Sequence, residues 1–147
     1  MRISDKIEAF ITELMKEENE YLELQRNELA SIFNCVPSQI NYVIATRFNR
    51  DRGYVVESRR GGGGYLRIRR IDNKGSILLD IRSAIGDTLG ENEANSYVSR
   101  LLGMNIINER EAGIILAATD DNALRSINSG KDIVRADIFK NILYNMV

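Results

Sequence analysis

The sequence has no histidine, no tryptophan and a single cysteine, Cys35. Zinc sites are built largely from cysteine and histidine, and a histidine-based catalytic triad needs its base, so neither kind of site is expected. One cysteine also forbids an internal disulfide, which suits the reducing environment of the cytoplasm. We therefore expect a cytoplasmic protein that holds no metal and no other cofactor.

Long apolar runs are absent as well. A membrane-spanning helix needs roughly 18 or more apolar residues in succession, and no stretch comes near that length. The first residues do not have the pattern of a secretory signal peptide. The 147 residues are 44% hydrophobic and 28% charged, which suits one or two small soluble domains with no membrane partner.

Negative charge is scarce in one region of the chain. The net charge is −1, but residues 40–70 carry eight arginines against Asp51 and Glu57, a balance of +6. Concentrated positive charge is typical of proteins with a polyanionic partner. Arginine is also well suited to bidentate contacts with phosphate and guanine. A solvated run of charges is the alternative interpretation.

A glycine run lies inside this basic region, in the segment RRGGGGYLRIRR. Residues 65–70 alternate between apolar and polar as a half-buried strand does, and residues 54–58 are predicted as the partner strand. The glycines between them predict a flexible, arginine-flanked hairpin tip, because glycine adopts backbone angles that other residues avoid. A flexible surface loop is the alternative. A Walker A phosphate loop is excluded because no Gly-Lys-Ser/Thr follows.

Just upstream, the apolar spacing of residues 29–43 matches a helix-turn-helix. Small Ala30 lets two helices approach, Asn34 tolerates the left-handed backbone of the turn, and Pro37 suits the first position of the second helix. Polar side chains at the start of such a helix contact base edges. Those predicted to face outward are Ser38, Gln39, Asn41, Tyr42 and Arg47. A merely solvated helix is the alternative.

The remaining segments complete two predicted domains. Ser4 is expected to cap a first helix, a short strand is possible at residues 21–24, and Asn27 is expected to cap the second helix. With the hairpin, residues 1–72 make a winged helix-turn-helix domain that binds double-stranded DNA. After a polar linker at residues 71–75 come four helical patterns, the first of which includes Ile85 and Leu89.

These four short helices make a marginal core by themselves, so a second copy is expected to cover part of their apolar faces. The predicted fold class is therefore α+β, with a C-terminal four-helix dimerisation domain over residues 76–147 and a homodimeric assembly. An intramolecular bundle without a partner is the alternative.

A family resemblance rests on the stretch CVPSQINYVIATRFNRDRGYVVESRRGGGGYLRI and, further on, INEREA and KDIVRA. These segments resemble the CtsR family, the class-three stress gene repressors of Gram-positive bacteria. The resemblance implies a dimeric repressor of heat-shock chaperone and Clp protease genes, whose glycine-rich wing enters the minor groove and senses temperature. It also implies that a protein arginine kinase modifies wing arginines, Arg60 foremost, and that ClpC-type protease machinery removes the repressor.

The predicted DNA-binding set thus extends beyond the second helix. It adds Arg26, Arg59, Arg60, Gly61, Gly62, Gly63 and Gly64. An enzyme with the glycine loop as a phosphate cradle is one alternative, but no paired-carboxylate, nucleophile–base or metal constellation accompanies the loop. A winged-helix RNA-binding regulator is the other, although the narrow major groove of A-form RNA does not admit a helix.

Overall fold

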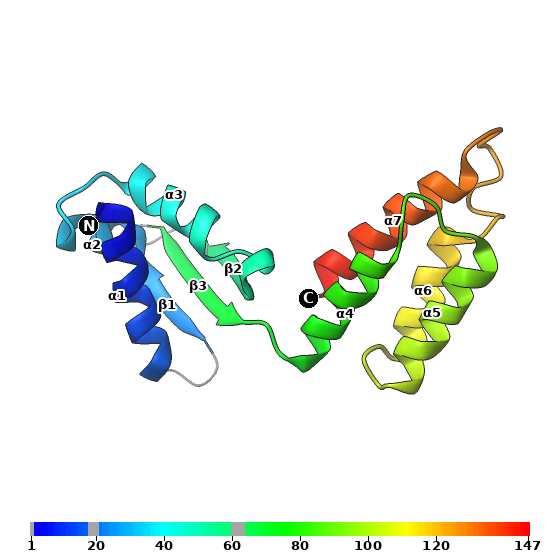
Figure 1. Ribbon diagram of the computed structural model, residues 1–147, viewed down its shortest axis with the longest axis horizontal. Helices are drawn as coiled ribbons and strands as arrows, with labels where there is room; N and C mark the ends of the chain where they lie inside the picture. Colours follow the sequence, from blue (N-terminus) through cyan, green and yellow to red (C-terminus); the bar gives the residue numbers. More distant parts are fainter. Residues whose placement is uncertain (1, 18–20, 60–63) are drawn as a thin grey trace. The chain divides into compact units, whose positions relative to one another are not determined.

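The computed structural model describes residues 2–17, 21–59 and 64–147. The chain forms two compact units, which meet in the sequence between Ile71 and Asp72. The first unit combines helices with a small antiparallel sheet (Figure 1). Its elements are α1 (Ile3–Glu17), β1 (Leu22–Gln25), α2 (Arg26–Ile32), α3 (Pro37–Arg47), the 3-10 turn η1 (Arg50–Arg52), β2 (Tyr54–Arg59) and β3 (Tyr65–Arg70).

The sheet has the order β1-β3-β2, so the last strand in sequence lies in the middle. Leu66 and Ile68 of β3 point into the core and are at most 1% exposed, which confirms the predicted alternation. Leu22 of β1 and Val56 of β2 flank Ile68 on either side. This apolar face packs with buried residues of all three helices, among them Ile11 of α1. The core therefore holds α3 and the β2–β3 hairpin in one body.

Two helix starts differ from the prediction. Ser4 lies inside α1, which begins at Ile3. The carbonyl of Arg2 accepts hydrogen bonds from the backbone amides of Asp5 and Lys6. Asn27 lies inside α2, because the chain leaves β1 at Gln25 and turns at once into the helix. Neither polar residue is therefore a cap. The buried Ser4 hydroxyl is used in a tertiary hydrogen bond instead.

The second unit consists of four helices, as predicted. They are α4 (Asn73–Ala84), α5 (Glu91–Gly103), α6 (Glu109–Thr119) and α7 (Lys131–Met146). Their shared core contains Val98, Leu101, Ile115, Phe139 and Leu143, all at most 3% exposed. The residues of this unit thus bury an apolar centre of their own, separate from that of the first unit.

A capping box stabilises the start of α6. The Asn108 side chain accepts from the Glu111 amide at 2.8 Å, and the Glu111 carboxylate accepts from the Asn108 amide at 2.9 Å. Two of the amides that a helix start leaves unpaired are satisfied in this reciprocal way.

The first helix of this unit lies earlier in the chain than predicted. Residues 71–75 are not a linker, because Asp72 caps α4 by accepting from the Gly75 amide at 2.8 Å. The helix also ends at Ala84, so Ile85 and Leu89 lie beyond it, although both are buried. The Leu89 amide donates to the Asp132 carbonyl at 3.0 Å, which holds this segment against the start of α7.

Arg135 of α7 is fully buried and was not singled out from the sequence. Its guanidinium donates to the carbonyls of Thr119 at 2.7 Å and Leu89 at 3.0 Å. It also pairs with the carboxylates of Asp121 and Asp132. A buried charge is tolerated when it is paired and hydrogen-bonded in this way. One side chain thus joins α7 to the end of α6, to the polar loop after it and to the segment before α5.

Candidate nucleic-acid interface

The helix-turn-helix of the first unit follows from local requirements of the sequence. Asn34 takes the left-handed backbone of the turn, with a φ of 50°, as predicted. The Cys35 amide donates to the Ala30 carbonyl at 2.9 Å, which closes the end of α2. Pro37 occupies the first turn of α3, where its missing N–H costs nothing. Ile40, Val43 and Ile44 then anchor the buried face of α3.

The opposite face of α3 is open to solvent at its start. Ser38, Asn41 and Tyr42 are exposed there, and 58% of the Tyr42 surface is accessible. Val36, directly before the helix, is also exposed. The side chains predicted at these three α3 positions therefore do lie outward, on a helix whose inner face is fixed by the core.

Two other α3 side chains do not lie free on that face. Gln39 is half-buried, and its Nε2 donates to the Ser4 Oγ of α1 at 2.9 Å. Arg47 is half-buried and pairs with two α1 carboxylates, at 3.2 Å to Asp5 and in closer contact with Glu8. The prediction that both face outward is therefore wrong. The physical reason is that α1 crosses α3 and offers polar partners that the α3 sequence does not reveal.

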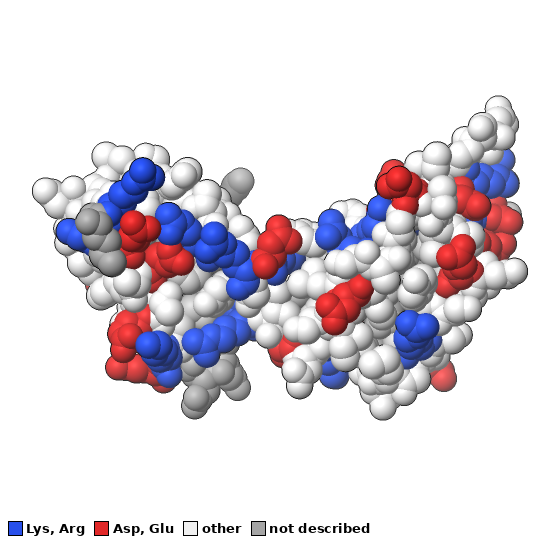
Figure 2. Space-filling view, viewed as in Figure 1, with Lys and Arg blue, Asp and Glu red and all other residues white. Residues whose placement is uncertain are grey.

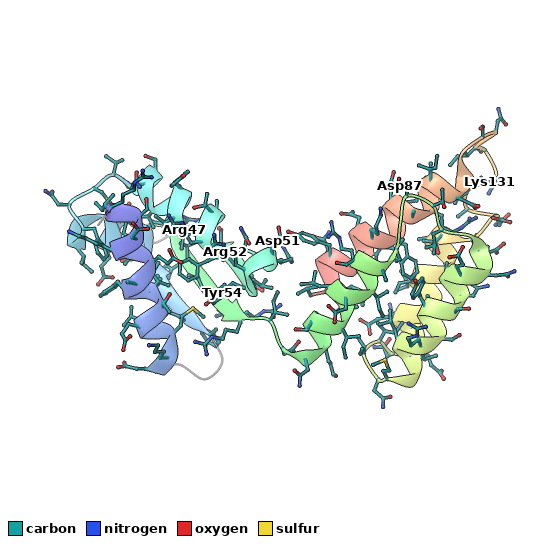
Figure 3. All side chains as sticks on the ribbon, viewed as in Figure 1. Arg47, Asp51, Arg52, Tyr54, Asp87 and Lys131 are labelled. Carbon is teal, nitrogen blue, oxygen red and sulfur yellow. The ribbon has the colours of Figure 1, made fainter. Side chains whose placement is uncertain are left out.

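The Arg47 pair belongs to a wider set of mixed charges. Hydrogen bonds that Arg47 donates to Glu8 and to Asp5 raise the pKa of Arg47 above its ordinary value. Arg52 of η1 approaches Glu8 at 3.9 Å; Figure 3 labels Arg47 and Arg52 at the end of α3 and in the turn after it. On the face shown in Figure 2, acidic atoms are interspersed among the basic atoms of the first unit.

A basic side chain of the hairpin is also paired with an acidic one. Arg67 of β3 pairs with Glu23 of β1 at 2.6 Å and lies over the Tyr21 ring, with its Cζ 4.3 Å from the ring centroid. Hydrogen bonding to Glu23 raises the pKa of Arg67. The balance of +6 in residues 40–70 is thus partly offset by acids from α1 and β1, which lie outside that range.

The tip of the hairpin is described only at its base. Gly64 precedes β3 with a φ of +83°, in the left-handed region that favours glycine. The predicted sites Arg60, Gly61, Gly62 and Gly63 lie outside the described residues, as does the side chain of Arg59. The strands on which the tip is mounted pair in full register from Tyr54–Arg70 to Arg59–Tyr65.

Arg26 connects the parts of this interface. Its Nε donates to the Asn41 Oδ1 at 2.6 Å, and its Nη2 donates to the Ser58 Oγ at 2.9 Å. Its backbone amide donates to the Gly64 carbonyl at 3.1 Å. One residue at the start of α2 therefore contacts α3, β2 and the base of the hairpin tip. The sequence places an arginine here but does not show these contacts.

Among the residues that the structure describes, no three His, Cys, Asp or Glu side chains gather as metal ligands would. No helix in the same part of the chain is both long and apolar enough to span a bilayer.

Comparison with known proteins gives consistent matches over both units. A family model for the CtsR N-terminal HTH domain matches residues 2–72, and one for the CtsR C-terminal dimerization domain matches residues 73–144. The transcriptional regulator CtsR of Staphylococcus aureus strain USA300 is 44% identical over 144 residues, which cover 96% of this chain and 94% of that protein. The protein of strain NCTC 8325 / PS 47 matches equally well.

A solved structure is also similar. The crystal structure of CtsR in complex with a 26 bp DNA duplex matches with a TM-score of 0.51 and 36% identity, covering 99% of this chain and 98% of the solved one.

Proposed function

The chain belongs to the CtsR family of transcriptional regulators, and from this premise we propose that it represses transcription by binding duplex DNA as a dimer. The observation that carries the proposal is the exposed start of α3 beside the β2–β3 hairpin. A helix presenting Ser38, Asn41 and Tyr42 suits the major groove, and a basic hairpin suits the backbone or minor groove. The relative solved with a DNA duplex supports the same assignment.

The proposed DNA contacts are those side chains together with Arg26 and the wing residues Arg59 to Gly64. Wing arginines are suited to the minor groove, where the potential is strongly negative. Gln39 and Arg47 remain predicted contacts, but each would first have to leave its partner on α1.

The experiment is enrichment of binding sites from a pool of random duplexes, followed by affinity measurements on the enriched duplex and on a scrambled one. We expect a specific site and a steep loss of affinity with salt, with a log–log slope near −0.9 for each phosphate neutralised. Failure to enrich any sequence would refute the assignment. Duplex RNA that competed as well as duplex DNA would instead favour an RNA-binding regulator.

The dimer is assigned to the second unit. This unit matches the dimerization domain and exposes large apolar side chains, with Met104 48%, Ile114 60% and Ile133 52% accessible. A partner that covered these side chains would remove their apolar surface from water, which favours association. We propose that a second copy of the chain covers these side chains.

Control by stress is assigned to the wing. Each glycine that becomes ordered on DNA loses on the order of 1–2 kcal/mol of backbone entropy, a cost that grows with temperature. Phosphorylation of Arg60 by a protein arginine kinase would replace a cation with an anion beside DNA phosphates. We therefore propose release of Clp protease and chaperone genes on heating, with removal of the repressor by ClpC-type machinery. A protein with this role acts in the cytoplasm and needs no catalytic step.

Band-shift titration at two temperatures tests the wing. Arg60→Lys keeps the charge but loses the planar fork, so it should bind more weakly and escape the kinase. Gly62→Pro stiffens the tip and should shift the temperature midpoint of binding. Midpoints that match the parent protein for both variants would exclude the wing as the sensor.

A further inference from the structure

The start of α3 holds a side chain whose orientation is set from outside the helix. Asn41 is exposed, and its Oδ1 accepts from the Arg26 Nε at 2.6 Å. Arginine has five N–H donors and no acceptor, so the Asn41 atom that faces it must be the oxygen. The orientation of the amide thus follows from chemistry and does not depend on telling oxygen from nitrogen in the coordinates. The Nδ2 group is turned away from Arg26 as a consequence.

Arg26 is itself held in place by two further contacts. Its Nη2 donates to the Ser58 Oγ of β2 at 2.9 Å, and its backbone amide is fixed by the Gly64 carbonyl at 3.1 Å. A Cβ at Gly64 would come within 3.1 Å of the Arg26 Nη1, so the glycine leaves room for this guanidinium. The side chain that orients Asn41 is therefore supported by the hairpin on its other side.

An amide whose orientation is fixed can form fewer combinations of hydrogen bonds with a base edge than a free one. A free asparagine contacts adenine with both groups, accepting from N6 and donating to N7. Here the oxygen already accepts a charge-assisted hydrogen bond, which is stronger than a neutral one. Asn41 has its two N–H donors and the second lone pair of Oδ1 left to present. N–H donors match the major-groove acceptors of guanine (O6 and N7), thymine (O4) and adenine (N7), whereas cytosine presents only its amino group there.

We propose that Arg26 is a positioning residue that fixes the amide of Asn41 with its N–H donors toward the base, so that Asn41 selects a base with a major-groove acceptor over cytosine, which has none. The inference rests on the proposed function, because it assigns a specificity to the same DNA interface. It concerns the choice of base at one position of the site, and it requires no direct contact between Arg26 and DNA.

The test uses the full chain and the duplex enriched from a random pool, with each base pair of the site replaced in turn. For the parent protein, one position should disfavour cytosine, and Asn41→Ala should abolish that preference. Arg26→Met removes all donors at nearly constant length, so the preference should fall about tenfold while other positions keep theirs. Arg26→Lys retains a donor and should restore part of it.

Arg70→Met provides the matched control, because Arg70 is an exposed cation of β3 in the same unit. It should lower affinity for every duplex by one common factor. The same uniform loss for Arg26→Met, with the base profile unchanged, would overturn the inference and leave the proposed function intact. A parent protein that enriches no sequence would instead overturn the proposed function.

A second variant, Asn41→Asp, tests the inference if Arg26→Met folds poorly. Asn41→Asp retains an oxygen for Arg26, since an exposed carboxylate pairs well with a guanidinium, but presents an acceptor where the donors were. A carboxylate matches the amino group of cytosine, so the preference against cytosine at that position should be lost. An unchanged preference against cytosine for Asn41→Asp would overturn the inference by itself.

Discussion

The amides of Gln39 and Asn41 lie two positions apart on α3 but have different tasks in the folded chain. Gln39 donates to the buried Ser4 hydroxyl at 2.9 Å, so Gln39→Ala should cost about 1 kcal/mol of stability by leaving that hydroxyl without its donor. Asn41→Ala should leave stability nearly unchanged but cost about 1–3 kcal/mol on the specific site. Urea unfolding and affinity titration measure the two effects. Equal losses of binding specificity would show that Gln39 leaves Ser4 on DNA.

The acidic partners of Arg47 predict a second effect at this scale. If Arg47 contacts DNA as proposed, Asp5 and Glu8 compete with the phosphates for it, and Glu8 also lies 3.9 Å from Arg52. The double variant Asp5→Asn, Glu8→Gln should therefore bind scrambled duplex more tightly and show a steeper salt slope, by about 0.9 for each phosphate gained.

The matched control makes the same charge change in the other unit, as Asp80→Asn, Asp137→Asn, two exposed positions. A rise in affinity of equal size in both double variants would mean that net charge alone is responsible, not the release of Arg47.

Single residues were predictable where the requirement is local. Asn34 and Pro37 are dictated by the turn and by the helix start, which a window of a few residues contains. The partners of Gln39 and Arg26 are 35 and 15 residues away, so no periodicity in α3 could reveal them. The candidate site was therefore predictable as a helix face, but the hydrogen bonds that decide which side chains are free on it were not.

At the scale of elements, periodicity found the strands and helices but not all of their ends. The alternation of residues 65–70 predicted β3 because its pattern is set by burial on one face. The end of α4 was missed because Ile85 and Leu89 are buried by packing beyond the helix, which keeps the apolar spacing after the hydrogen-bond ladder has stopped. That β1 would join β3 at the sheet edge also depends on contacts distant in sequence.

Three glycine variants test how the backbone at the base of the wing affects stability and DNA binding, with Gly86 of the second unit as the control. Gly86 has no positive φ and open space around its Cβ position, Gly53 has a φ of +92° and open space, and Gly64 combines a φ of +83° with Arg26 at 3.1 Å. Gly86→Ala should be nearly neutral. Gly53→Ala should cost about 1–2 kcal/mol from backbone strain alone. Gly64→Ala should cost at least as much and also weaken DNA binding.

Thermal unfolding and affinity titration of the three variants separate strain from crowding. If Gly64→Ala matches Gly53→Ala in both measurements, the space that Gly64 leaves for Arg26 has no effect on binding.

At the scale of the whole molecule, two units with separate cores predict separable functions. A fragment of residues 1–72 keeps the entire core of the first unit, so it should fold and remain monomeric. It should bind a two-site duplex much more weakly than the full chain, because linkage between the sites is lost. Sedimentation and titration of the fragment measure both properties. A fragment that dimerised at micromolar concentration would refute the assignment of the dimer to the second unit.

The burial of Arg135 has a consequence for arginine chemistry in this protein. Only 1% of its side chain is accessible, so a reagent or enzyme that attacks guanidinium groups cannot reach it in the native fold. Exposed arginines such as Arg70 carry no such protection. Covalent modification of Arg135 would therefore show that the second unit had unfolded, at least locally, before the modification took place.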